Sequence, residues 1–80
     1  TYYNEIYLVG TLVELVQEYT YQGEKFGRCK LNVKRKKEKE ATDQLQVIIP
    51  MSLINKEHLI GKRVEVRGNL RAFPKVYVYE

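Results

Sequence analysis

Residues 28–34 read Arg-Cys-Lys-Leu-Asn-Val-Lys and alternate strictly between basic or polar and apolar side chains. Successive side chains of a β-strand point to opposite faces, so Cys29, Leu31 and Val33 are predicted to face a core. The opposite face then carries the polar members of the stretch, Arg28, Lys30, Asn32 and Lys34. A row of cations on a β-surface is a suitable counterpart for a phosphate backbone. The alternative is an ordinary solvated sheet face.

The length of 80 residues predicts one domain, spanning residues 1–80, with a small core unless the chain assembles into an oligomer. Hydrophobic residues make up 44% and charged residues 30%, which is typical of a globular chain. The net charge of +4 points to an acidic partner such as nucleic acid. Cys29 is the single cysteine, and no apolar run is long enough to span a membrane. We therefore expect a soluble domain without disulfides, in a reducing cytoplasm.

Hydrophobic alternation and glycine or proline breaks divide the chain into short elements. Five strands are predicted, over residues 6–15, 25–36, 45–49, 63–67 and 76–79. Gly10 is expected to bend the first strand or to mark a bulge in it. Residues 21–24 are expected to form a turn in which Gly23 takes a positive φ.

The apolar spacing changes between residues 51 and 60, which predicts one short helix there. Ser52 is expected to cap the helix and Gly61 to end it. Five short strands with a helix between the third and the fourth predict an all-β fold, a five-stranded OB-fold barrel. An SH3-like barrel needs no helix at this place. A ferredoxin-like fold needs a helix after the first strand, where residues 20–23 read as a turn instead.

Three blocks of the sequence also resemble bacterial and phage single-stranded-DNA-binding proteins. Residues 4–12 (NEIYLVGTL) are similar to the opening strand of that family, N-x-[VI]-x-L-[VI]-G-x-L. Residues 19–23 (YTYQG) resemble its Y-T-x-x-G turn, and residues 62–71 (KRVEVRGNLR) resemble its fourth strand. The blocks agree with the family in order and approximate spacing. The short form is most similar to the compact, tail-less variants of clostridia and phages.

The resemblance implies an OB barrel that binds single-stranded DNA by stacking bases on aromatic rings and by contacting phosphates with basic residues. It also implies a homo-dimer or homo-tetramer in the cytoplasm, at the bacterial nucleoid or in a phage-infected cell. The chain has no tryptophan, so the stacking has to rest on Tyr or Phe. It shows no acidic C-terminal tail of the kind through which family members recruit replication and repair proteins, which leaves such partners open.

Binding single strands without sequence preference requires cations that follow the phosphates and flat side chains on which bases stack. The candidate nucleic-acid-binding residues are Arg28, Lys30, Lys34 and Lys36 of the second strand, Gln44 and Gln46 of the third, Arg71 after the fourth, and the rings of Tyr21 and Phe73. The two rings are chosen because loop positions leave them exposed. The alternatives are that Tyr21 only fixes its turn and that Phe73 plugs the end of the barrel.

The first strand carries apolar residues on both of its faces, with Ile6 and Leu8 on one and Tyr7 and Val9 on the other. A strand that is buried in a barrel on one side and by a partner subunit on the other needs this pattern. Tyr7 and Val9 are therefore the candidate oligomer interface.

No nucleophile–base pair, H-E-x-x-H motif or phosphate-cradling glycine loop occurs in the sequence. We therefore expect no enzymatic activity, no metal and no cofactor. The leading hypothesis is a protein that coats single-stranded DNA in replication, recombination or repair. The alternatives are an accessory OB module similar to primosomal replication protein N, an OB protein-interaction module and an RNA-binding module. Four like charges on one face of a strand repel one another unless an anion lies there, which argues against the interaction-only alternative.

Overall fold

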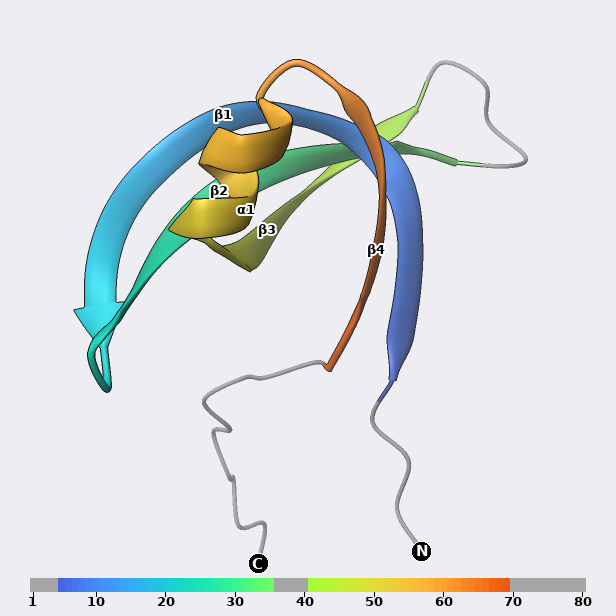
Figure 1. Ribbon diagram of the computed structural model, residues 1–80. Helices are drawn as coiled ribbons and strands as arrows, with labels where there is room; N and C mark the ends of the chain where they lie inside the picture. The colour runs from blue at the N-terminus through green and yellow to red at the C-terminus, as the bar shows by residue number, and fades with distance from the viewer. Residues whose placement is uncertain (1–4, 36–40, 70–80) are drawn as a thin grey trace, which may run out of the picture.

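The part of the chain that the structure describes forms a curled antiparallel sheet with one short helix on its concave side (Figure 1). The computed structural model describes residues 5–35 and 41–69. Its elements are β1 (Ile6–Tyr21), β2 (Glu24–Lys34), β3 (Thr42–Pro50), α1 (Met51–Glu57) and β4 (Arg63–Gly68). The strand order is β3-β2-β1-β4, and every neighbouring pair is antiparallel.

This half-barrel, with its helix between β3 and β4, is consistent with the predicted OB-fold. Four strands lie within the described residues, and β3 and β4 are the two edges of their sheet. The fifth predicted strand, over residues 76–79, lies outside the described residues, as do Lys36, Arg71 and Phe73. In the described ranges, no helix is long and apolar enough to cross a membrane.

β1 continues to Tyr21, well beyond its predicted end at Leu15, because two irregularities let it curl. Its first half pairs with β4, and from Thr11 onward it pairs with β2. The β1–β2 register shifts once after Leu12 and again after Leu15. A β-bulge bends the bulged strand and increases its twist. One long strand therefore pairs with β4 on one side along its first half and with β2 on the other side along its second half.

The irregularities of β1 are not at Gly10, where the sequence predicted them. Gly10 permits a close approach instead, because an added Cβ would collide with the backbone carbonyl of Asn32. Gly27 has the same role on the concave side of β2. An added Cβ there would lie 2.7 to 2.8 Å from side-chain atoms of Leu15, Met51 and Ile54. α1 therefore packs directly against the backbone of β2.

A two-residue turn, Gln22–Gly23, joins β1 to β2. Both residues have positive φ, 48° and 78°, a combination found in the tight turns whose twist matches that of the flanking strands. The predicted turn over residues 21–24 is confirmed, with Tyr21 opposite Glu24. This turn fixes which residues of β1 and β2 share a face.

The core lies between the concave side of the sheet and α1. Its buried residues are Leu12, Cys29, Leu31, Ile49, Met51 and Ile54. Cys29 and Leu31 are 0% exposed, which confirms the predicted inward face of β2. Burial also raises the pKa of the Cys29 thiol, so this cysteine stays neutral and behaves as a small apolar side chain.

α1 is shorter than predicted and begins without a side-chain cap. Pro50 occupies the N-cap position, and Ser52, the predicted cap, lies inside the first turn. His58 ends the helix in the left-handed conformation, with a φ of 50°. Gly61, the predicted end, instead turns the chain towards β4 with a φ of 90°, and its N–H donates to the carbonyl of Leu12 at 2.6 Å. The connection between α1 and β4 is therefore held on β1.

Candidate nucleic-acid interface

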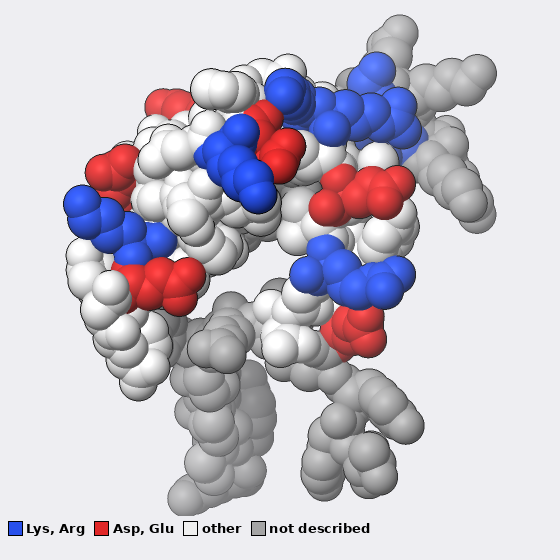
Figure 2. All heavy atoms as spheres, viewed as in Figure 1, with Lys and Arg blue, Asp and Glu red and all other residues white. Residues whose placement is uncertain are grey.

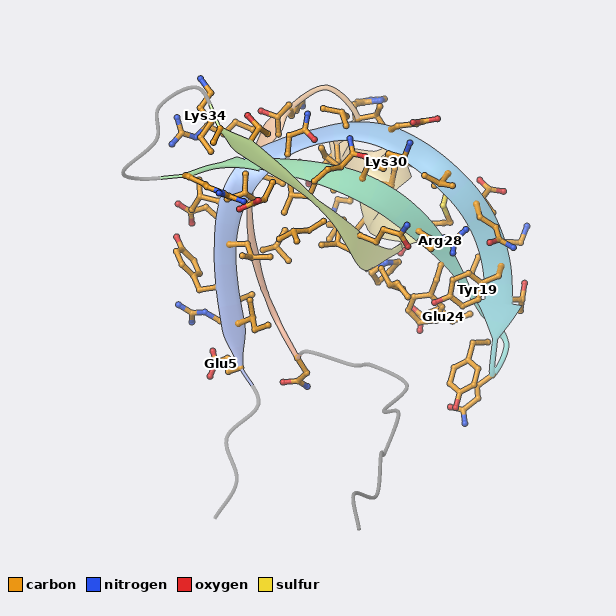
Figure 3. All side chains as sticks on the ribbon, turned by 180° about the vertical axis from the view of Figure 1, so that it is seen from behind. Glu5, Tyr19, Glu24, Arg28, Lys30 and Lys34 are labelled. Atoms are coloured by element: carbon orange, nitrogen blue, oxygen red, sulfur yellow. The ribbon has the colours of Figure 1, made fainter. Side chains whose placement is uncertain are left out.

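The outer face of β2 carries a row of basic and polar side chains. We define the basic face as Arg28, Lys30, Asn32 and Lys34 of β2 with Gln44 and Gln46 of β3. Arg28, Lys30 and Lys34 follow one another along the strand (Figure 3). They lie on the side opposite the buried Cys29 and Leu31. The sequence-predicted separation of the two faces therefore holds over the whole of this stretch.

The two glutamines of β3 lie on the basic face, as predicted. The register places Gln46 opposite Lys30 and Gln44 opposite Asn32. Gln44 Nε2 donates a hydrogen bond to Asn32 Oδ1 at 3.2 Å. Gln46 is exposed, so its amide is available to a base or a sugar.

Lys30 already has an anionic partner within the chain. Its Nζ lies 3.2 Å from Glu14 Oε2. The bulge that follows Leu12 places Glu14 opposite Lys30, where an unbroken register would place Val13. Glu14 therefore offsets one of the like charges on this face, and their mutual repulsion calls for an external anion less strongly than the sequence indicated.

Arg28 and Lys34 form no ion pair with any residue that the structure describes. Arg28 is half-buried, and its Nε is shielded from solvent without a hydrogen-bond partner in the described part of the chain. Across the sheet it lies between Gln17 of β1 and the exposed Ile48 of β3. A guanidinium carries five N–H donors and no acceptor, so this end of the row is suited to an anionic ligand.

Arg35, just beyond the end of β2, is held by an acid rather than offered to a ligand. Its Nη2 lies 2.8 Å from Asp43 Oδ1, and its Nε donates to the same carboxylate at 3.1 Å. This hydrogen bonding lowers the pKa of Asp43. The pair joins the end of β2 to the start of β3.

An aromatic cluster borders the basic face at the hairpin end. Tyr19 and Phe26 are opposite one another in the register and stack, with ring centroids 5.9 Å apart. Tyr21, which the sequence predicted as a stacking residue, is 58% exposed beside them on the same face. Tyr19 and Phe26 were not among the residues predicted from the sequence. Phe26 has the same parity in β2 as Arg28, and counting outward from Gln22–Gly23 pairs it with Tyr19.

The β1–β4 end of the outer face has a different character. Tyr7 is 52% exposed, and the guanidinium carbon of Arg67 lies 5.6 Å from the centroid of its ring. Arg67 Nε also lies 3.5 Å from Glu5 Oε1. Partial desolvation, followed by hydrogen bonding to Glu65, raises the pKa of the Tyr7 hydroxyl. Val9, the other candidate interface residue, is half-buried opposite Glu65.

The side of the molecule that carries α1 mixes the two signs of charge. In that view, Lys and Arg side chains lie beside Asp and Glu over much of the described surface, and a run of neighbouring Lys and Arg side chains lies along the upper right edge (Figure 2). Within the described ranges, no group of three or more His, Cys, Asp or Glu side chains could hold a metal ion. The basic face with its aromatic border is therefore the candidate site.

A curled antiparallel sheet, with a short helix between β3 and β4 and a basic outer face, defines an OB-fold binding domain. No family model matches the chain, and no curated protein matches it. Among solved structures it is similar to the N-terminal domain of PriB from Thermoanaerobacter tencongensis, which is described as dimeric. The sequences are 32% identical over 88% of this chain and 78% of that one, with a TM-score of 0.73. The chain therefore belongs to the OB-fold family of this PriB domain.

Proposed function

We propose that this protein binds single-stranded DNA without sequence preference through the basic face and the aromatic cluster. One observation carries the proposal. Cations and stacked rings, the two components that such binding requires, lie on the same face of β1 and β2 (Figure 3). Likeness to the PriB domain supports a binding role for this fold.

The geometry suggests how a strand would lie. Arg28 and Lys34 are six residues apart on β2, a distance of about 20 Å along an extended strand. Phosphates would contact these two side chains, while unpaired bases stack on Tyr19, Phe26 and Tyr21. Gln46 would hydrogen-bond whichever base or sugar lies beside it. Duplex DNA buries its base faces in its own stack, so only the phosphate contacts would remain.

The proposal extends to assembly. Tyr7 and Val9 are proposed to form a homo-dimer interface, and the PriB domain, described as dimeric, supports self-association in this family. The exposure of Tyr7 in the single chain is compatible with that role. A homo-tetramer is the larger alternative.

The proposed setting is the bacterial cytoplasm, where the protein would coat single strands during replication, recombination or repair. A second candidate is the accessory role of a primosomal replication protein N, which the likeness to PriB favours. The two differ in stoichiometry. A coating protein saturates a long single strand, whereas an accessory module binds at a limited number of places.

The proposal is tested by titrating fluorescent oligo-dT, duplex DNA and RNA of equal length at two salt concentrations. We expect the tightest binding to oligo-dT, with log affinity falling against log salt by roughly 0.7 per phosphate contact. Equal affinity for the duplex, or no response to salt, would contradict it. Tighter binding to RNA would redirect the assignment to RNA. Protein bound per nucleotide on a long single strand then separates coating from the accessory role.

A further inference from the structure

We propose that Glu14 occupies the place of a DNA phosphate on Lys30 and thereby limits the affinity of the basic face. This inference rests on the proposed function, because it concerns the same surface. Glu14 would thus lower the affinity for DNA, although it makes no favourable contact with the nucleic acid.

The geometry of the pair supports this assignment. Glu14 Oε2 and Lys30 Nζ are 3.2 Å apart, with side-chain exposures of 58% for Glu14 and 35% for Lys30. The pair lies at the surface, where an incoming strand would reach it. Glu14 faces Lys30 only because the register of β1 shifts after Leu12. Without that shift, the apolar Val13 would be opposite the lysine.

The neighbouring cations provide the contrast. Arg28 and Lys34 lie on either side of Lys30 along β2, and neither is paired with an acid in the parts of the chain that the structure describes. The middle of the three cations is therefore the one that carries a carboxylate. A phosphate entering the row meets two available charges and one that is already occupied.

The physical consequence concerns both affinity and salt dependence. Exposed ion pairs are weak, so a phosphate can displace Glu14 from Lys30. The displaced carboxylate remains beside the bound phosphate, repels it and attracts a cation from solution. The net number of cations released on binding is then smaller than the number of phosphates contacted, and the salt slope is shallower.

A different explanation is that Glu14 and Lys30 form an ordinary cross-strand pair that only stabilises the sheet. In that case, removing the carboxylate would change the stability of the fold. The affinity for DNA would change only as much as it does when any one negative charge is removed from the protein. The two explanations predict different binding data, so binding can decide between them.

The experiment compares Glu14→Gln with Glu18→Gln, using titrations of oligo-dT at several salt concentrations. Glu18 is an exposed acid on the same strand, and it forms no ion pair with the described residues. Both variants lose one negative charge, so Glu18→Gln measures the general charge effect. We expect Glu14→Gln to bind roughly 2- to 5-fold more tightly at low salt and to steepen the salt slope by roughly 0.7. Glu18→Gln should produce less than half of either change.

The same substitution is then made in a Lys30→Ala background, where Glu14 has no lysine to occupy. There, the effect of Glu14→Gln should fall to less than half of its effect in the parent. Equal effects of the two glutamine variants in the parent, or an undiminished effect of Glu14→Gln beside Lys30→Ala, would overturn the proposal. Circular dichroism establishes that each variant is folded. Failure of the parent chain to bind any oligonucleotide would remove the proposed function and this inference together, whereas parent binding that is indifferent to Glu14→Gln would remove only the inference.

Discussion

Tyr19 of β1 and Phe26 of β2 stack across the hairpin, with their ring centroids 5.9 Å apart and their planes inclined by 25°. This pair lies next to Arg28, the cation of the basic face nearest the Gln22–Gly23 turn. Stacked rings beside a guanidinium provide a surface on which a base can continue the stack. The chain has no tryptophan, so the proposed stacking of bases rests on this pair and on Tyr21.

Tyr19→Ala should weaken binding to oligo-dT, because base stacking on an aromatic side chain is worth about 1–3 kcal/mol. Tyr19→Phe keeps the ring and should bind nearly as well as the parent chain. Fluorescence titration at fixed salt measures both. Equal binding by Tyr19→Ala, Tyr19→Phe and the parent would show that bases do not stack at this position.

Removal of individual cations should have unequal effects. Arg28→Ala and Lys34→Ala should each weaken binding to all sequences alike and flatten the salt slope by roughly 0.7. Lys30→Ala should have a smaller effect, because Glu14 already offsets this charge. The free energy of unfolding should change by no more than about 0.5 kcal/mol for the exposed Lys34. Titration of the three variants measures the order of their effects on DNA binding, and urea unfolding measures their stability. A larger loss of binding for Lys30→Ala than for the other two variants would contradict the predicted order.

The basic face could be predicted well from the sequence, because the two-residue period of a β-strand decides which side chains share a face. Alternation alone separates Arg28 and Lys30 from Cys29 and Leu31, and the structure confirms the buried side. The Gln22–Gly23 turn also fixes the register at its own end of the hairpin. The pairing of Tyr19 with Phe26 could therefore have been predicted from the sequence. Tyr21 was predicted instead because a loop position leaves its ring exposed.

Other features depend on tertiary packing and have no local signal. The register shifts after Leu12 and Leu15 follow from the curvature that lets β1 serve two neighbours, and nothing in the alternation marks them. The Glu14–Lys30 contact therefore could not be predicted. The same holds for the end of α1, where His58 adopts the left-handed conformation ahead of the glycine that the sequence favoured.

Gly27→Ala should destabilise the fold, because the added Cβ would meet Leu15, Met51 and Ile54 at 2.7 to 2.8 Å. Overpacking of this kind costs about 1–3 kcal/mol. Gly68→Ala is the matched control, since no atom of residues 5–35 or 41–69 lies within 4 Å of the position of its added Cβ. Urea unfolding should show a clear loss for the first variant and no loss for the second. Equal stabilities would mean that the ends of the Leu15, Met51 and Ile54 side chains move aside without cost.

The Arg35–Asp43 pair should make stability depend on pH in a defined direction. The folded-state pKa of Asp43 lies below its ordinary value of 3.8 because Arg35 hydrogen-bonds the ionised form. The stabilisation is therefore fully present above pH 3.8 and is lost as the pH falls through the lower, folded-state pKa. The urea midpoint of the parent should exceed that of Asp43→Asn at neutral pH, and the difference should shrink in acid. A difference that grows in acid would contradict this sign.

Tyr7→Asp should convert a dimer into a monomer. Tyr7 is an exposed ring on the outer face of β1, and Arg67 lies over it at 5.6 Å from the ring centroid. An aspartate there would remove the ring and place a second carboxylate beside Glu65 and Arg67, so a partner subunit would have to bury charged groups in place of an apolar ring. Tyr7→Phe removes only the hydroxyl and should leave the assembly intact.

Light scattering at micromolar concentration measures the mass of the parent and both variants, with circular dichroism to establish that each is folded. We expect a dimeric mass for the parent and for Tyr7→Phe, and a folded monomer for Tyr7→Asp. Binding to oligo-dT should survive in that monomer, because the basic face lies on β2 and β3. If the parent is monomeric, or if its assembly is indifferent to Tyr7→Asp, the interface does not include this tyrosine. If Tyr7→Asp remains a dimer but loses DNA binding, Tyr7 belongs to the nucleic-acid surface instead.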